Sequence, residues 1–203
     1  MSFNALPNEI LCSLPLYIDN IETFINARAT CRRLRDAFDR THTNIILQLA
    51  DASAPKFFSP HPHFLIAVTA RQVSDWALGD EERTMKLREA FRGGMDSLYD
   101  FCLRHSGLTL DRIRQTYLSR FSIINPFIDK IAEEKRMSTP NLGDGEASDA
   151  DTIRTLYTRQ AFRILIYGEL FGYSMVAGLE PENDLPYFDI DMRLEYCKYI
   201  VSD

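Results

Sequence analysis

The sequence predicts an all-α protein built from short and medium-length helices. Apolar residues recur at helical spacing along most of the 203-residue chain, and no segment alternates apolar and polar residues over the length of a strand. Proline, glycine and capping residues separate these segments, and no internal repeat is present. Hydrophobic residues make up 45% of the chain and charged residues 26%, which is typical of a globular protein with a buried core.

The first of the expected helices begins near Pro7. Proline suits the first turn of a helix, because its missing N–H would have had no partner there. Ile10, Leu11 and Leu14 then share one helical face. Pro15 ends the helix, because the residue before a proline is pushed out of the α conformation.

Two more short helices follow before residue 42. Asp19 and Glu22 have the form of a capping box for the second helix, and Thr30 is a candidate N-cap for the third. The apolar stripes of these two helices are Ile21, Phe24 and Ile25, and Cys31, Leu34 and Phe38. Helices this short are marginal in isolation, so we expect them to pack on each other, on the following domain or on a partner.

The order of residues in this segment is more specific than its helical pattern. Leu6-Pro7-Asn8-Glu9 opens the segment, and Cys31-Arg32-Arg33-Leu34-Arg35 follows. This arrangement resembles the F-box, a three-helix module that binds a Skp-type adaptor and so joins a cullin–RING ubiquitin ligase. The resemblance implies an F-box over residues 3–42 and a compact multi-helix domain over residues 43–203, which would present a surface to a protein substrate.

The resemblance also implies a docking surface. The residues that would face or support the adaptor are Leu6, Pro7, Glu9, Ile10, Leu14 and Ile18, and those that would be core or contact positions are Cys31, Leu34 and Phe38. One departure from the family pattern is visible, because Ala29 and Thr30 stand where a large apolar residue and valine are common. On this interpretation no residue of the chain is catalytic, since the transfer chemistry belongs to the partners.

Beyond residue 42 the pattern predicts one helix after another. The expected helices cover residues 43–50, 63–78, 81–92, 95–106, 110–121, 125–136, 152–179 and 189–201, with the N-caps Thr43, Asp80, Thr109, Asn125, Asp151 and Asp189. Loops are expected at 51–62 and 138–150, which are dense in turn-forming residues. Gly168 and Gly172, within the longest helix, indicate either a close helix contact or a kink.

The region after the F-box-like segment resembles the helical extension of many fungal F-box proteins, whose substrates are unassigned. The sequence segments on which this resemblance rests are HPHFLIAVTARQVSDWA at 61–77, REAFRGGMDSLYDFC at 88–102 and IYGELFGYS at 166–174. The chain has no propeller or leucine-rich repeats of the kind that hold substrate in other members of the family.

The sequence predicts no cofactor and no metal. A metal site at His61 and His63 would need further ligands, and nothing in the sequence indicates which residues would supply them. Gly143-Asp144-Gly145 lacks both a preceding strand and the Gly-Lys-Ser/Thr of a phosphate loop. Asp189 and Asp191 point to different helix faces, so they are poor candidates for paired catalytic carboxylates.

The charge pattern argues against nucleic-acid binding. Five arginines and two aspartates lie between residues 28 and 40, but the whole chain carries a net charge of −6. We therefore interpret the arginines as a solvated or partner-facing surface. From Glu180 onward, seven acidic residues accompany two basic ones, which indicates a soluble helix face or a surface that attracts a basic target.

The sequence favours a reducing, intracellular location in the cytoplasm, the nucleus or both. Its four cysteines form no Cys-x-x-Cys pair, and the N-terminus lacks the basic and apolar regions of a signal peptide. No membrane span is expected, because the longest uncharged run in the most apolar segment, Leu170 to Leu179, is much shorter than the ~20 residues that cross a bilayer.

The function expected from these observations is recruitment of a protein substrate to an SCF-type cullin–RING ubiquitin ligase. Two alternatives remain at this point. One is an interaction protein that uses the F-box fold outside a ligase. The other is a helical ligand-binding protein or an enzyme without a recognisable motif, because a fold does not by itself fix a function.

Overall fold

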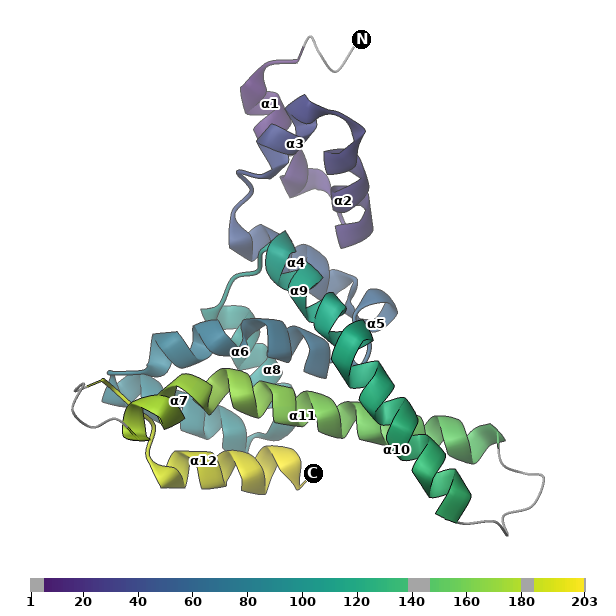
Figure 1. The fold of residues 1–203 in the computed structure, drawn as a ribbon. Helices are drawn as coiled ribbons and strands as arrows, with labels where there is room; N and C mark the ends of the chain where they lie inside the picture. The colour runs from purple at the N-terminus through teal and green to yellow at the C-terminus, as the bar shows by residue number, and fades with distance from the viewer. Residues whose placement is uncertain (1–5, 139–146, 180–184, 203) are drawn as a thin grey trace.

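The computed structural model describes residues 6–138, 147–179 and 185–202, and every regular element in these ranges is helical (Figure 1). The predicted all-α class is therefore confirmed. In chain order the elements are α1 (Asn8–Ser13), η2 (Leu14–Tyr17), α2 (Ile21–Thr30), α3 (Arg32–Phe38), α4 (Thr43–Ala52), α5 (Ala54–Phe57), α6 (His63–Ala77), α7 (Glu81–Arg92), α8 (Gly94–His105), α9 (Leu110–Ser119), η3 (Arg120–Ile124), α10 (Asn125–Ser138), α11 (Ala147–Leu179), α12 (Ile190–Tyr196) and η5 (Cys197–Val201). The short element η2 is a 3-10 helix, and η3 and η5 are π-helical turns.

The helices α1, α2 and α3 form a small unit at one end of the molecule (Figure 1). The ring centroids of Phe24 and Phe38 lie 4.9 Å apart between α2 and α3. Leu11 of α1 and Leu34 of α3 are buried in the same core. The three predicted stripes therefore do meet, and each short helix gains from its neighbours the burial that it lacks alone.

A buried serine joins this unit to the rest of the chain. The hydroxyl of Ser53, which follows α4, accepts a hydrogen bond from the Ile21 N–H at 3.1 Å and donates one to the Leu49 carbonyl at 2.8 Å. The first of these bonds pairs an N–H at the start of α2, which has no partner within the helix. The start of α2 is thus tied to the end of α4.

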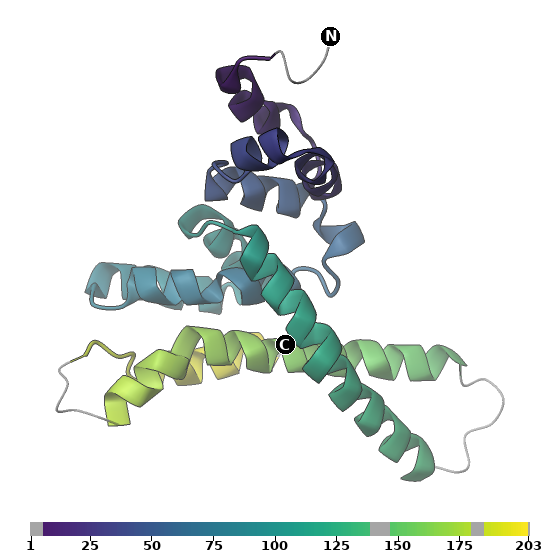
Figure 2. The same ribbon diagram turned by 45° about the horizontal axis from the view of Figure 1, so that its top comes forward.

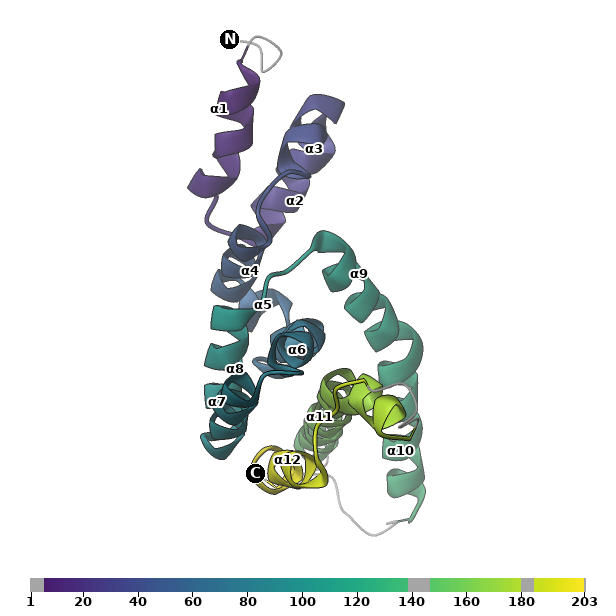
Figure 3. The same cartoon turned by 90° about the vertical axis from the view of Figure 1, so that its left-hand side faces the viewer.

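The larger part of the molecule is organised around α11. Among the described elements α6 makes the most extensive contact with it, and α6, α7 and α8 lie on one side of α11 while α9 and α10 lie on the other (Figure 3). The Ser74 hydroxyl of α6 donates a hydrogen bond to the Leu170 carbonyl of α11 at 2.6 Å. Phe171 packs in an aromatic cluster, with ring centroids 4.9 to 6.1 Å from those of Phe91, Tyr167, Phe188 and Tyr196.

The helices α9 and α10 form one continuous rod that crosses α11 (Figure 2), so the predicted break at Asn125 is wrong. The Asn125 N–H bonds to the Arg120 carbonyl, five residues earlier, in the π-helical turn η3. Inside a helix, Pro126 lacks the N–H for a bond to the carbonyl four residues before it, and its ring would press on that carbonyl. A local π-helical turn accommodates such a defect without ending the helix.

Two helix starts near the N-terminus use residues other than those predicted. Asn20 caps α2, because its side-chain oxygen accepts a hydrogen bond from the Thr23 N–H at 2.8 Å, whereas Asp19 accepts one from the Asn20 side chain. Thr30 is the last residue of α2, and Cys31 precedes α3 without a side-chain cap. Asparagine and aspartate are about equally good caps, so the sequence alone did not separate these two neighbours.

Three further boundaries differ from the prediction. Residues 51–62 are not a continuous loop, because α4 extends to Ala52 and Pro55 stands in the first turn of α5. His42, and not Thr43, caps α4 through a hydrogen bond from the Asn44 N–H to its ring Nδ1. The predicted loop at 138–150 lies largely outside the described residues, and α11 begins at Ala147, before the expected cap Asp151.

Candidate docking surface

A row of apolar side chains lies on the surface of the α1–α2–α3 unit. Ile10 and Leu14 are one helical turn apart, and Tyr17 continues the row because side chains three residues apart eclipse in a 3-10 helix. Ile10 is 47% exposed, Leu16 63% and Tyr17 83%, while Leu14 is half-buried. Leu16 precedes Tyr17 in the same 3-10 turn and points to another side of it. We call Ile10, Leu14, Leu16 and Tyr17 together the apolar row.

The structure places the predicted docking residues in three environments. Pro7, Glu9 and Ile10 are exposed; Leu6, Leu14, Ile18 and Cys31 are half-buried and pack on the core; Leu34 is buried. The sequence left open whether Leu34 is a core position or a contact position. Its exposed fraction is 4%, so it is a core position. Ile10 and Leu14 are brought together by local helical geometry, whereas Leu6 precedes α1 and Ile18 follows η2 in an extended conformation.

The arginines of this segment do not act as one solvated face. The Arg33 guanidinium donates hydrogen bonds to the Leu6 carbonyl and, at 2.9 Å, to Asn8 Oδ1. The Arg28 guanidinium pairs with the Asp39 carboxylate at 2.5 Å. Two of the arginines therefore hold the unit together, and Arg33 in particular fixes the start of α1 against α3. The exposed arginines are Arg32, Arg35 and Arg40.

Sequence reasoning missed the two most exposed members of the apolar row. Leu16 and Tyr17 follow Pro15, at which the first helix was expected to end, so no helical stripe included them. The chain instead continues as a 3-10 helix with Pro15 in its first turn. The composition of Leu14-Pro15-Leu16-Tyr17 could have indicated a contact surface at this turn. A turn this apolar is unfavourable in water unless another surface covers it.

No metal-binding group of three or more His, Cys, Asp or Glu side chains occurs among the described residues. The exposed His61 ring packs edge-on against Tyr99 at 5.1 Å, whereas His63 is buried. Burial, and then the positive charges of Arg163 and Arg159, lower the pKa of His63 to about 4. At neutral pH this imidazole is neutral and enclosed by the protein.

The buried Cys102 and the half-buried Tyr99 are held in their uncharged forms. Burial raises the pKa of the Cys102 thiol to about 12, so it is protonated at neutral pH and is a poor nucleophile. Burial, followed by the hydrogen bond and negative charge of Asp51, raises the pKa of Tyr99 well above its usual value. Both groups therefore contribute to packing in their neutral state.

Among the described residues, no helix is long and apolar enough to cross a membrane. Comparison with protein-family models, with curated proteins and with solved structures returned no match to this chain. The features available for a functional assignment are therefore the motif in the first forty residues and the surface that those residues form.

Proposed function

We propose that this protein recruits a substrate to an SCF-type cullin–RING ubiquitin ligase. Its α1–α2–α3 unit docks a Skp-type adaptor, which in turn joins the cullin, and the helical domain after it presents a surface to the protein substrate. The chain itself performs no chemistry and requires no cofactor in this role. The same assignment places the protein inside the cell, in the cytoplasm, the nucleus or both.

The observation that carries the proposal is the apolar row on a three-helix unit that carries the F-box-like motif. Three of its side chains, those of Ile10, Leu16 and Tyr17, are exposed within one short stretch of chain, although the core of the unit already buries Leu11, Phe24 and Leu34. Exposed apolar clusters of this kind mark interaction sites, because covering them removes apolar area from water. The exposed Arg32 and Arg35 on α3 add positive charge, which steers association with an acidic partner.

The proposal is tested by size-exclusion chromatography of the chain with a purified Skp-type adaptor. We expect co-elution of the wild-type chain and its loss in the Ile10→Asp variant, because burying an unpaired carboxylate in the interface costs several kcal/mol. Ile10 is 47% exposed in the free chain, so the substitution buries no charge in the protein's own core. Leu14→Asp is a weaker test, because Leu14 packs on that core.

A matched control is Met85→Asp, which places the same charge at a site 56% exposed on α7, in the other part of the molecule. Both variants are first checked by circular dichroism. Co-elution of folded Ile10→Asp, or failure of the wild-type chain to bind any adaptor, contradicts the proposal. Binding of adaptor without cullin supports instead an interaction protein that acts outside a ligase.

A further inference from the structure

A surface hollow with both apolar and polar lining lies far from the apolar row, between the start of α7 and the segment that leads into α12. Its volume is about 630 Å³. The residues that line it are Leu78, Gly79, Asp80, Glu81, Thr84, Leu185, Pro186, Tyr187, Phe188 and Asp189. Leu185 is 55% exposed and Tyr187 63% exposed, so two large apolar side chains of this wall face water. We call this hollow the α7–α12 groove.

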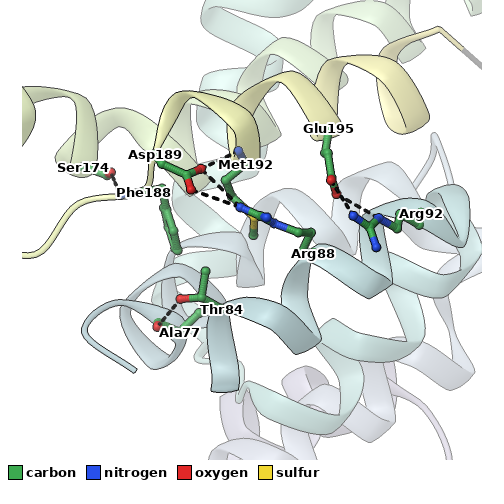
Figure 4. A network of polar contacts seen from close by, with 9 residues as sticks. All are labelled: Ala77, Thr84, Arg88, Arg92, Ser174, Phe188, Asp189, Met192 and Glu195. Carbon is green, nitrogen blue, oxygen red and sulfur yellow. Dashed lines mark hydrogen bonds and ion pairs between the residues drawn. The ribbon is translucent and has the colours of Figure 1, made fainter. Parts of the chain in front are cut away.

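One wall of the groove is held in place where it leads into α12, by polar contacts of Phe188 and Asp189 (Figure 4). The Phe188 N–H donates a hydrogen bond to the Ser174 hydroxyl of α11. The next residue, Asp189, pairs with Arg88 of α7 at 3.1 Å. Phe188 itself is 3% exposed, so its ring fixes the wall on the core. The α12 end of this wall is therefore fixed before any partner arrives, which lowers the entropy that binding must overcome there.

The opposite wall begins at a tight turn and is also fixed. Gly79 has a φ of 82°, in the left-handed region that favours glycine. Asp80 then caps α7 by accepting a hydrogen bond from the Arg83 N–H at 3.0 Å. The Thr84 hydroxyl donates a hydrogen bond to the Ala77 carbonyl at 3.0 Å (Figure 4). These bonds hold the mouth of the groove at the first turn of α7.

Three carboxylates line the groove, and one of them, that of Glu81, is left without an ion-pair partner among the described residues. The carboxylates belong to Asp80, Glu81 and Asp189, and the lining contains no lysine or arginine. Asp80 pairs with Arg83, and Asp189 with Arg88, whereas no ion pair joins Glu81 to another described residue. A hollow lined by apolar side chains and carboxylates is complementary to a segment that carries both an apolar side chain and a positive charge.

We propose that the α7–α12 groove binds a peptide segment in which a lysine or arginine stands beside a large apolar residue. The inference rests on the proposed function, since it makes such a segment the feature by which a protein substrate is recognised. The apolar side chain packs against Leu185 and Tyr187, and the cation lies by the Glu81 carboxylate. The chain's net charge of −6 draws a basic segment toward this surface before contact.

Selection from a random-sequence peptide library on the immobilised full chain tests the inference. We expect selected peptides to be enriched in lysine or arginine next to leucine, phenylalanine or tyrosine. A selected peptide, labelled with fluorescein, then reports the dissociation constant by fluorescence polarisation. Rising salt weakens the binding, because the Glu81 carboxylate is exposed and its field is screened.

Two charge reversals on the same helix provide the matched comparison. Glu81→Lys replaces an attraction by a repulsion, and we expect it to raise the dissociation constant roughly three- to tenfold. Glu89→Lys makes the same charge change at another exposed position of α7 that does not line the groove, and we expect it to change the constant less than twofold. Tyr187→Ala removes an exposed part of the apolar wall and weakens binding without loss of fold.

The inference is overturned if the selected peptides show no enrichment in basic residues, or if the two reversals weaken binding equally. Enrichment in apolar residues alone points to an uncharged partner and also overturns it. Adaptor co-elution, measured on the same Glu81→Lys preparation, is expected to stay intact. If the wild-type chain binds the adaptor but selects no peptide, the groove alone is refuted; if it binds a selected peptide but no adaptor, the ligase role alone is refuted.

Discussion

Arg88 donates hydrogen bonds to both carboxylate oxygens of Asp189, at 3.3 and 3.1 Å, across 101 residues of chain. The same carboxylate accepts a hydrogen bond from the Met192 N–H at 2.6 Å and so caps α12. One side chain therefore starts a helix and attaches it to α7. The neighbouring pair of Arg92 with Glu195, at 2.6 Å, continues the contact between the two helices.

The cap of Asp189 contributes more stability than its ion pair. We expect Asp189→Ala to lower the free energy of unfolding by about 1 kcal/mol, because alanine offers no acceptor to the N-terminal N–H groups. Asp189→Asn keeps the acceptor and removes the charge, and we expect a loss of only a few tenths of a kcal/mol, since pairs this exposed are worth little. Urea unfolding of both variants measures the difference. Equal losses would show that the ion pair is the larger contribution.

Ser53 couples the N-terminal unit to α4. We expect Ser53→Ala to cost about 1–3 kcal/mol, because it leaves the Ile21 N–H buried without its partner. Amide hydrogen exchange is the direct measurement, and faster exchange should appear at the start of α2. Ser13→Ala is a control, since the Ser13 hydroxyl donates only to the nearby Ile10 carbonyl in an exposed setting. A protection pattern unchanged by Ser53→Ala would contradict the coupling.

The stability of the fold should decrease as the pH falls from about 6.5 to about 4. His63 has a pKa of about 4 in the folded protein and an ordinary value of 6.5, so in this window the unfolded chain binds a proton that the folded chain does not. Integrated over the window, the loss is roughly 3 kcal/mol. Above pH 6.5 the imidazole is neutral in both states and contributes no pH dependence.

His63→Gln removes the titrating group and supplies the comparison for this prediction. The unfolding free energy of the variant, measured by urea titration across the same pH window, should vary less than that of the wild-type chain. Because Arg159 and Arg163 add positive charge near the ring, high salt should also reduce the wild-type dependence. Parallel pH profiles for the two proteins would contradict the assignment to His63.

Gly168 and Gly172 make no close contact that a larger side chain would obstruct. A Cβ placed at either position has no atom within 4 Å, and α11 continues through both. We therefore expect each substitution by alanine to stabilise the protein by roughly 0.5–1 kcal/mol, because glycine loses more conformational entropy in a helix.

Gly107→Ala is the opposite case and serves as the control. A Cβ at this position would lie 2.2 Å from the Thr43 hydroxyl oxygen, so we expect destabilisation. Thermal unfolding should therefore show a higher midpoint for the α11 variants and a lower one for Gly107→Ala. A lower midpoint for Gly168→Ala would show that this surface has a partner, such as a second copy of the chain.

The sequence by itself determined the helices and many of their starts. Asp80, Thr109 and Asp189 each cap a helix as predicted, by accepting a hydrogen bond from an N–H three residues further on. Such a contact lies within one turn, so residue type and spacing suffice to predict it. The apolar stripes of the helices could likewise be predicted from the sequence, because the period of a helix is a local property.

Only the tertiary structure decided which side of each stripe faces water. Ile10 and Leu11 belong to one predicted stripe, yet Ile10 is 47% exposed and Leu11 is 1% exposed. Arg33 was expected among solvated or partner-facing arginines, but it binds the Leu6 carbonyl from the other end of the unit. The α7–α12 groove similarly joins residues about a hundred positions apart. Burial and such contacts depend on which distant segments meet, and no local pattern encodes that meeting.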